Sequence, residues 1–455
     1  MLAVKRTRRL DPDPAFTAAF RELAPRLPGS ANEPLARIRE EGFARFLALG
    51  IPTQRDEAWK FTNVARIANR PMRPATATEL PLDRVLPYLL GGPRARRLVF
   101  VDGRLQPQWS HTGGLPQGVI VESLARAAET RPLALAEALG ELDDGRSFTA
   151  LNTAFADGGA WIELPAGLAL EAPLQLLFVT TGGEVPVMSH PRCVLRLGDG
   201  ASLTLLETHV GLGEGAALTN AVLQLALRPG ARLEHDRIQL PAAQGSLLAK
   251  IDGSLGAGAR YRQTTVLLGG ALVRNEHELR IDGPGVDCLL SGVAVPGTGE
   301  QSDIVVRIHH RAGGSHSDQY FKHVVEDRGH AAFAGKIVVH PGAQKTNAYQ
   351  KNDNLLLSDD GEVDTKPELE IYADDVKCSH GATCGELDAG ALFYLRSRGI
   401  ARQAARAILV HAFAAEVIGR LADPTARALA ETRLVARLGG GLDGALVETV
   451  LGEAA

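Results

Sequence analysis

The sequence is poor in cysteine, in aromatic side chains and in net charge. Its 455 residues include four cysteines, and Phe, Trp and Tyr together make up 5% of the chain. So few cysteines, unevenly spaced, argue against a disulfide framework and for a reducing compartment. A formal net charge of -4 gives no basic field, and few rings are available to stack on bases, so nucleic acid is not an expected partner.

Sequence patterns typical of a membrane-spanning segment, a secretion signal or an ATP-binding loop are also missing. No segment offers about 18 uncharged apolar residues, and the most apolar stretch, 407–418, is interrupted by His411 and Glu416. The opening MLAVKRTRRLDPDP is basic but is not followed by an apolar h-region. No P-loop motif occurs, so any dependence on ATP must come from another subunit. We therefore expect a cytoplasmic protein without a membrane partner.

Glycine and proline, by contrast, are abundant and are dispersed through apolar stretches. From about residue 160, alternating apolar residues are cut by turns that end in Gly-Ala at Gly200, Gly230 and Gly258, with a degenerate copy at Gly285. These intervals of 30, 28 and 27 residues, without helices between them, are typical of the stacked coils of a β-solenoid. A β-sandwich would also alternate but has no reason to keep the interval. The sequence thus predicts a mainly β core over 156–387.

Helical patterns flank this core. In the N-terminal part, 1–155, apolar residues recur at helical spacing over 32–50, where a final glycine marks the helix end. The topology of 70–155 stays open. In the C-terminal part, 388–455, helical spacing returns, and the pair Asp423–Pro424 is a typical helix start. We expect a mixed N-terminal domain and a C-terminal helical domain that either caps the solenoid or presents a groove to a partner.

The stretch DDVKCSHGATCGELD places Cys378, His380 and Cys384 within seven residues. Thiolate and imidazole are ligands that zinc, iron and copper prefer. The other two cysteines, Cys193 and Cys288, are far away in sequence, and closed zinc sites usually show two paired motifs rather than one cluster. A self-contained metal site is therefore disfavoured, and a site completed by groups from elsewhere is favoured.

A second group of candidate residues precedes this stretch. Six of the thirteen histidines lie within 32 residues: His309, His310, His316, His323, His330 and His340. Successive coils could stack them in a ladder, or they could be unrelated strand and turn positions. Asp303, Arg311, Asp318 and Lys322 in the same region could form the acid/base cluster of a carbohydrate-cleaving β-helix enzyme. The sequence does not select between these interpretations.

Two longer stretches resemble a known family. Residues 346–406, which include AYQKNDNLLLS and VKCSHGAT, and the run PTQRDEAWKFTN, 52–63, closely resemble the SufB/SufD family of the SUF iron-sulfur cluster assembly system. The resemblance implies a right-handed parallel β-helix between N-terminal and C-terminal helices. It also implies a non-catalytic scaffold subunit that pairs with SufB through the β-helix cores and binds the ATPase SufC through the C-terminal helices.

Within this family, two substitutions place the chain nearer to SufD than to SufB. SufB-like proteins carry a cysteine in a Q-C-D-S-L-L context, where this chain has Asn352, and asparagine is a poor ligand for iron or persulfide sulfur. The SufB-like HEAT motif is here HGAT, in which Gly381 replaces a carboxylate while His380 is kept. Cys384 departs from the SufD-like pattern, which has an aliphatic residue, and is either a ligand or a small packing group.

The resemblance implies that Cys378 and His380 form one side of a metal site shared with SufB, where a nascent Fe-S cluster is held transiently. Reduced flavin in the complex, a homodimer of the isolated chain and the subunit stoichiometry are left open. The alternative is a β-helix enzyme acting on carbohydrate, which in most settings would carry a secretion signal.

Overall fold

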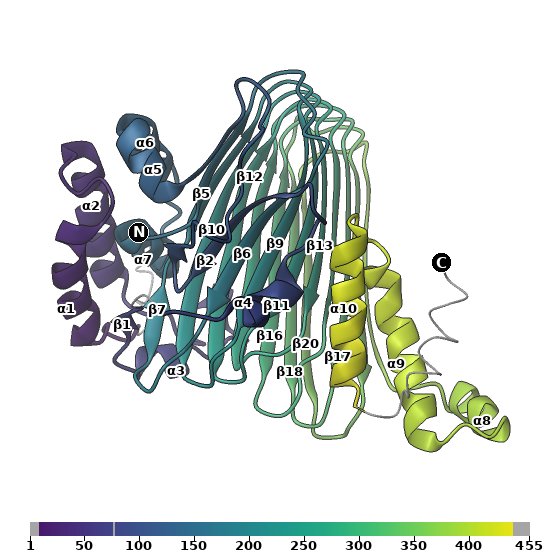
Figure 1. The fold of residues 1–455 in the computed structure, drawn as a ribbon. Coiled ribbons are helices and arrows are strands. Elements are labelled where there is room, and N and C mark those ends of the chain that lie inside the picture. Colours follow the sequence, from purple (N-terminus) through teal and green to yellow (C-terminus); the bar gives the residue numbers. More distant parts are fainter. Residues whose placement is uncertain (1–8, 76–77, 440–455) are drawn as a thin grey trace, which may run out of the picture.

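The computed structural model describes residues 9–75 and 78–439. Two sheets of stacked strands form its centre, and helices lie against their outer faces (Figure 1). The first sheet contains β4 (Ile120–Ser123), β5 (Ala160–Leu164), β8 (Arg192–Leu197), β10 (Ala217–Leu227), β12 (Gly245–Leu255), β14 (Leu272–Ile281), β16 (Gln301–His310), β18 (His330–Val339) and β20 (Glu362–Ile371), with β1 (Arg73–Pro74) and β7 (Val187–Ser189) beside this row. The second sheet contains β3 (Arg104–Leu105), β2 (Arg96–Val101), β6 (Leu174–Thr180), β9 (Ser202–Gly211), β11 (Arg232–Leu240), β13 (Arg260–Leu267), β15 (Asp287–Ala294), β17 (His316–Val325), β19 (Asn347–Leu356) and β21 (Lys377–Gly385).

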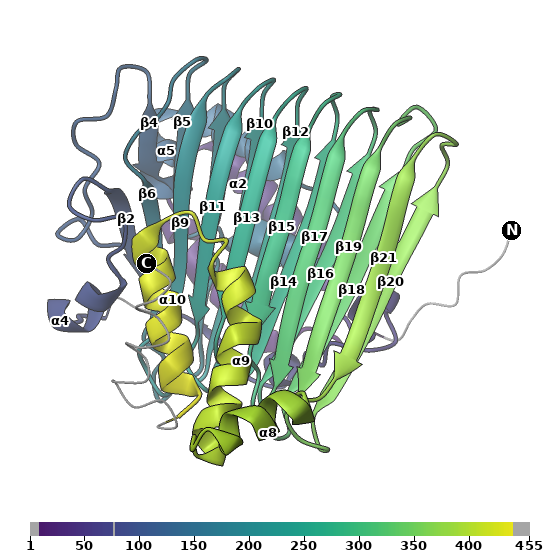
Figure 2. The same ribbon diagram turned by 90° about the vertical axis from the view of Figure 1, so that its right-hand side faces the viewer.

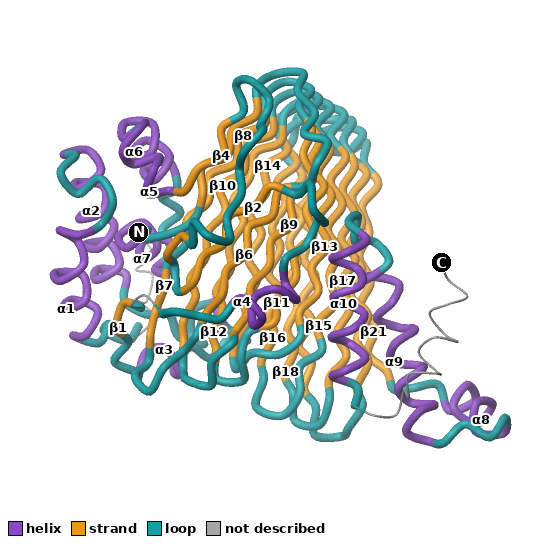
Figure 3. Tube along the Cα trace, in the orientation of Figure 1, coloured by secondary structure: helices purple, strands orange, loops and turns teal. Residues whose placement is uncertain are grey.

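From β8 onward the chain alternates between the two sheets, so each turn adds one strand to each. Strands that are two apart in the chain pair in parallel, as β10 does with β12 and β17 with β19. Loops and turns gather at the two ends of the strands (Figure 3). This arrangement is a parallel β-solenoid and confirms the predicted fold class. Because the register is constant, side chains of successive turns stack in columns.

Small residues at the turns explain the repeat interval. Gly200 and Gly230 have φ angles of 65° and 69°, which glycine adopts without the strain that a Cβ atom would cause. Ala201 and Ala231, which follow them, have no exposed surface. A larger side chain there would separate the stacked turns. The Gly-Ala pairs of the sequence therefore mark one corner of the solenoid.

Apolar clusters fill the interior and seal both outer faces. Inside, residues such as Leu195, Leu223 and Phe333 belong to one cluster that runs through most turns. On the outer face of the second sheet, Val266 and Val324 pack against the C-terminal helices. Burial of apolar surface on both faces is the expected source of stability for a parallel sheet.

Most of the N-terminal region packs against the outer face of the first sheet (Figure 1), whereas Val85, Tyr88 and Leu90 pack on the outer face of the second sheet. Its helices are α1 (Pro14–Leu23), α2 (Glu33–Leu49), α3 (Ala65–Ala68), α4 (Leu82–Val85), α5 (Leu124–Thr130), α6 (Pro132–Glu141) and α7 (Ser147–Phe155), with short 3-10 turns η1 (Ala24–Arg26), η2 (Glu57–Trp59) and η3 (Leu86–Tyr88). Gly50 ends α2, as predicted, and Asn32 caps its start. The structure also resolves the topology of 70–155: β2 joins the second sheet in parallel with β6, while β4 pairs antiparallel with β5. The division of the chain at 155 and 387 stays a prediction.

The C-terminal helices are α8 (Ala389–Ser397), α9 (Arg402–Ile418) and α10 (Pro424–Arg437). Asp423 caps α10 and Pro424 begins it, as predicted. Figure 2 shows α9 and α10 across the outer face of the second sheet, whereas α8 lies at its lower edge and has no buried residue. The helices therefore cover a side of the solenoid and leave its last turn exposed. Within the described ranges, no helix is both long and apolar enough to cross a membrane.

Candidate functional site

Cys378 and His380 lie on β21, the last strand of the second sheet. Among the described residues, β21 pairs in parallel with β19 on one side and with no strand on the other. Figure 2 shows β20 and β21 together at one end of the stack. His380 is exposed and Cys378 is half-buried, because no further turn covers them. The site thus lies at the open end of the solenoid.

Strand geometry decides which way these side chains point. Alternate residues of a strand face opposite sides of the sheet. Cys378 is in register with Ala348 on β19, and His380 with Gln350. Ala348 and Gln350 are buried in the solenoid interior, at 0% and 3% exposure. Cys378 and His380 therefore share the interior-facing side of β21, as expected from their spacing, and Ser379 faces outward.

The surroundings of Cys378 differ from those of His380. Cys378 packs against an apolar cluster that includes Ile337, Val339 and Ala348. Burial raises the pKa of the Cys378 thiol, although the backbone of Ala348 acts in the opposite direction. A raised pKa keeps the thiol protonated at neutral pH, and a protonated thiol is a weak ligand. His380 has no such apolar packing and is open to a partner.

The chain brings few ligands together here. Cys384 also falls on the interior-facing side of β21 and is exposed. Cys193 and Cys288 are buried in earlier turns, where burial raises the pKa of Cys193 to about 12. In the part of the chain that the structure describes, no group of three or more His, Cys, Asp and Glu side chains could hold a metal ion. Ligands for a stable metal site would have to come partly from another molecule.

The six clustered histidines do not form a ladder. On the outer face of the first sheet, His309 Nδ1 lies 3.4 Å from His340 Nε2. His310 and His323 lie inside the solenoid, where they contact Ser317 and Asn354 respectively. His316 and His330 lie at its surface, where His316 packs beside Tyr349 and His330 contacts Asp364. The group therefore has no common site.

The acid/base cluster that the sequence left as an alternative is not assembled either. Asp303 belongs to the first sheet, where it has 1% exposure. Asp318 and Lys322 belong to the second sheet, and Lys322 lies beneath α9 with its Nζ 2.7 Å from Glu416. Arg311 pairs with Asp282 at 3.2 Å in a turn. Residues on separate faces cannot act on one glycosidic bond, so the structure gives no support to a carbohydrate-cleaving site.

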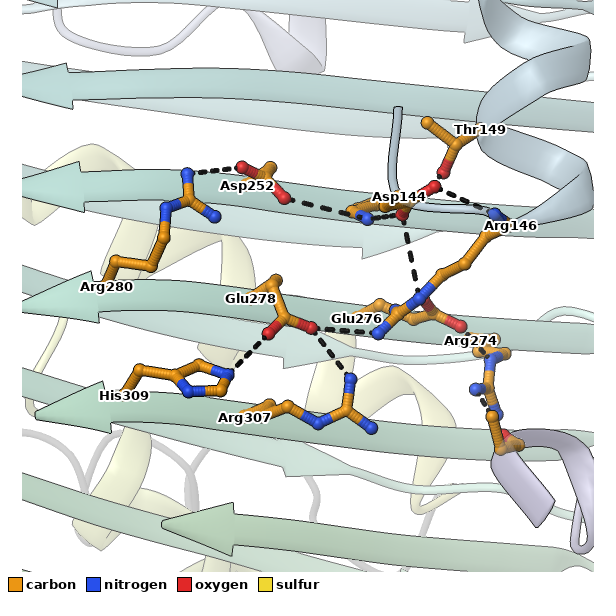
Figure 4. A network of polar contacts seen from close by, with 12 residues as sticks. Asp144, Arg146, Thr149, Asp252, Arg274, Glu276, Glu278, Arg280, Arg307 and His309 are labelled. Atoms are coloured by element: carbon orange, nitrogen blue, oxygen red, sulfur yellow. Dashed lines mark hydrogen bonds and ion pairs between the residues drawn. The ribbon is translucent and has the colours of Figure 1, made fainter. Parts of the chain in front are cut away.

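Charged residues on the outer face of the first sheet form an ion network instead (Figure 4). Arg146, which precedes α7, contacts Glu276 at 2.5 Å and Glu278 at 2.8 Å on β14. Glu278 also contacts Arg307 at 2.8 Å and His309 at 3.0 Å on β16. Burial alone would raise the pKa of Glu278, but the hydrogen bond from His309 and the charges of Arg146 and Arg307 lower it to about 2. The network ties the N-terminal region to the solenoid.

Sequence reasoning missed two residues behind His380. Gln350 on β19 and Gln319 on β17 are in register with each other, and Gln350 is in register with His380. Each therefore faces the interior in the same column as His380. Gln350 precedes His380 by 30 residues and follows Gln319 by 31, which is the length of one turn. Counting back by the repeat interval from His380 would have found them.

Models of two related families match almost the whole chain. Residues 12–176 match the SufBD protein N-terminal region, and residues 178–413 match the SufBD core domain of SUF-system FeS cluster assembly. The chain belongs to the SufBD family.

Individual SufBD relatives agree with this assignment. The chain is 33% identical to the iron-sulfur cluster assembly protein SufD of Escherichia coli, over 91% of this chain and 95% of that protein. It is 32% identical to an iron-sulfur cluster assembly SufBD family protein of Synechocystis sp., over 84% and 87% of the two chains. SufD of Bacillus subtilis is 28% identical over 61% and 64%. The resemblance seen in the sequence is confirmed, and the protein is a SUF-system Fe-S cluster assembly protein.

Proposed function

We propose that this protein is the SufD-type scaffold subunit of a SUF complex, without catalytic activity of its own. It would pair with a SufB subunit through the open end of the solenoid and carry part of a nascent Fe-S cluster at that junction. The observation that supports this most directly is an exposed end strand, β21, which pairs on one side only and presents Cys378 and His380 toward the interior side. These two groups are too few to hold a cluster alone, so a partner must add ligands.

The two residues would have different roles. A neutral imidazole ligates iron directly, and His380 is exposed at the edge where a partner would dock. Cys378 is half-buried against apolar side chains, so packing is its main contribution in the free chain. Sulfur ligands would then come mainly from the partner. A mixed and incomplete ligand set favours later release of the cluster.

Substitution at each position tests this proposal. We expect His380→Ala to reduce iron and acid-labile sulfide severely in the anaerobically reconstituted complex with SufB and SufC homologues, while gel filtration still shows intact subunit association. Cys378→Ala should reduce them less. Ser379→Ala is the matched control, because Ser379 lies between them and faces outward. A normal cluster content in the His380→Ala complex would contradict the shared site.

The second partner we propose is the ATPase SufC, bound through the C-terminal helices. The apolar faces of α9 and α10 are occupied by the second sheet, whereas α8 exposes Phe393 and Tyr394 at 74% and 57%. Exposed aromatic side chains are typical anchors of a protein interface. We expect Phe393→Asp to abolish co-purification of SufC while SufB is retained. Retention of SufC would move its binding site away from α8.

A further inference from the structure

The column that ends at His380 contains two buried amides, and three of their four side-chain polar atoms have no hydrogen-bond partner. Gln350 Nε2 donates to the backbone oxygen of Gly335 on β18 at 3.4 Å, and Gln350 Oε1 has no hydrogen-bond partner. One turn deeper, Gln319 has 0% exposure and neither of its amide atoms is bonded. A buried acceptor without a donor costs free energy, so an unbonded Oε1 one position from His380 requires an explanation.

The space around Gln350 is specific to its amide. A Cβ atom on Gly335 would lie 2.5 Å from the Gln350 amide, so glycine at 335 leaves room for this side chain. The backbone oxygen of Gly335 can only accept a hydrogen bond, which directs Nε2 toward it and leaves Oε1 as the free atom. The orientation of the amide is therefore fixed by the opposite sheet.

Asn352 and Asn354, the next two interior-facing residues of β19, show what a structural amide pair looks like. There, Asn354 Nδ2 donates to Asn352 Oδ1 at 2.8 Å, and Asn354 Oδ1 contacts His323 at 2.8 Å. These groups bond to one another within the chain. Gln350 and Gln319 are equally buried and in register but do not close on each other. The columns of Asn352 and Asn354 end on the same exposed strand, at Ala382 and Cys384, whereas the column of Gln319 and Gln350 ends there at the imidazole of His380.

We propose that Gln350 is the positioning residue for His380. In the assembled complex its Oε1, which has no partner in the free chain, would accept the N-H of one imidazole nitrogen, so that the other nitrogen presents its lone pair to iron. Histidines that bind metals generally donate their second ring N-H to an oxygen acceptor, which fixes the tautomer and the ring plane. The two side chains are adjacent on neighbouring strands, about 4.8 Å apart in backbone spacing, and share one face. This inference rests on the proposed role of His380 as an iron ligand.

The test compares two variants of Gln350 in the full complex with SufB and SufC homologues. Gln350→Leu removes the acceptor, and Gln350→Glu keeps an acceptor of similar length. Tyr349→Phe is the control, since Tyr349 is on the same strand and faces outward with 39% exposure. Two quantities are measured on the anaerobically reconstituted complex: the rate of iron loss to a chelator, and the ¹⁵N hyperfine coupling of the reduced cluster in protein labelled with ¹⁵N-histidine.

We expect Gln350→Leu to lose iron about 10- to 100-fold faster and to show an altered ¹⁵N coupling, as is usual when an outer partner of a ligand is removed. Gln350→Glu should lose iron no faster than the unmodified protein. Equal rates and couplings in Gln350→Leu and unmodified protein would overturn the proposal, and so would equally fast loss in both variants, which would indicate a packing role. If Gln350→Leu does not assemble, the rate of iron loss in Gln350→Glu decides. A rate no faster than in the unmodified protein supports the proposal, and a faster rate overturns it. Unchanged iron in His380→Ala would instead overturn the proposed function.

Discussion

At the residue scale, Asn352 stands where the SufB-like pattern has a cysteine, and its side chain is closed to ligands. Asn352 lies on β19, has 1% exposure and faces the interior of the solenoid. Its Nδ2 donates to the backbone oxygen of Phe321 at 3.3 Å, and its Oδ1 accepts from Asn354. Buried polar groups of this kind are bonded because leaving them unpaired is costly. Asn352 therefore stabilises the fold through hydrogen bonds, at a position where a thiol would be a ligand for iron or sulfur.

Restoring the thiol should weaken the fold without creating a metal site. In Asn352→Cys the oxygen of Phe321 loses its donor and Asn354 loses one acceptor, so we expect the free energy of unfolding to fall by about 1–3 kcal/mol. Urea unfolding followed by circular dichroism measures it, and Lys351→Ala, on the exposed outer side of the same strand, should change it by less than about 1 kcal/mol. Stoichiometric iron bound to the isolated Asn352→Cys chain would contradict this reading of the position.

The sequence led to Cys378 and His380 through a resemblance and through spacing, because both residues lie on one short strand. It did not lead to Gln350 or Gln319, since these lie one and two turns earlier and meet His380 only through register. The difference between the thiol and the imidazole also needed the structure. Burial of Cys378 depends on Ile337 and Val339 from the opposite side of the solenoid.

At the element scale, the ion network of Figure 4 joins the turn before α7 to β14 and β16. Burial opposes ionisation of Glu278, but His309 and nearby arginines hold its pKa at about 2, below the ordinary value of 4.5. A glutamate whose pKa is lower in the folded state stabilises the protein above pH 4.5, and this contribution is lost as the pH falls from 4.5 toward 2. The attachment of the N-terminal region should therefore weaken in acid.

Arg146→Met tests this attachment. Removing one partner of a largely buried ion pair leaves Glu276 and Glu278 less compensated, so we expect a loss of about 3 kcal/mol in unfolding free energy at pH 7. The loss should shrink between pH 4.5 and 2, when the glutamates take up protons. Arg126→Met removes an exposed pair with Glu129 and should cost less than about 1 kcal/mol. Equal pH profiles for Arg146→Met and the unmodified protein would rule out this role for the network.

The repeat was predictable only where its turn residues are typical. Gly200, Gly230 and Gly258 precede alanine and were visible in the sequence, but the corner continues at Gly314 and at Lys345, which has a φ of 61°. Lysine in that conformation gives no local signal, because left-handed backbone is normally marked by glycine or asparagine. The pairing of β2 with β6 was equally invisible, since partners so distant in sequence leave no periodic pattern.

At the scale of the whole molecule, the solenoid ends in two strand edges that differ. The N-H of Glu362 bonds to the oxygen of Gly329, directly before β18, so the N-H groups of alternate residues from Val363 on point to the open edge of β20. Pro367 is one of these positions and has no N-H to offer, which is where proline is tolerated in a sheet. The edge of β21 has no proline. An unpaired edge of this kind recruits another strand, so β21 is the better surface for the proposed pairing with SufB.

A proline in β21 should separate folding from association. The N-H of Lys377 bonds to the oxygen of Thr346, directly before β19, so the N-H of Ala382 points to the open edge. Ala382→Pro removes that donor without breaking a bond to β19, and we expect an unchanged circular dichroism spectrum but no heterodimer with SufB on gel filtration. Ala382→Ser keeps the N-H and should still associate. The isolated chain provides a further readout, because any homodimer through the same edge should also be lost in Ala382→Pro and kept in Ala382→Ser. If Ala382→Pro still forms the heterodimer, SufB is held by another surface and His380 has no partner strand beside it.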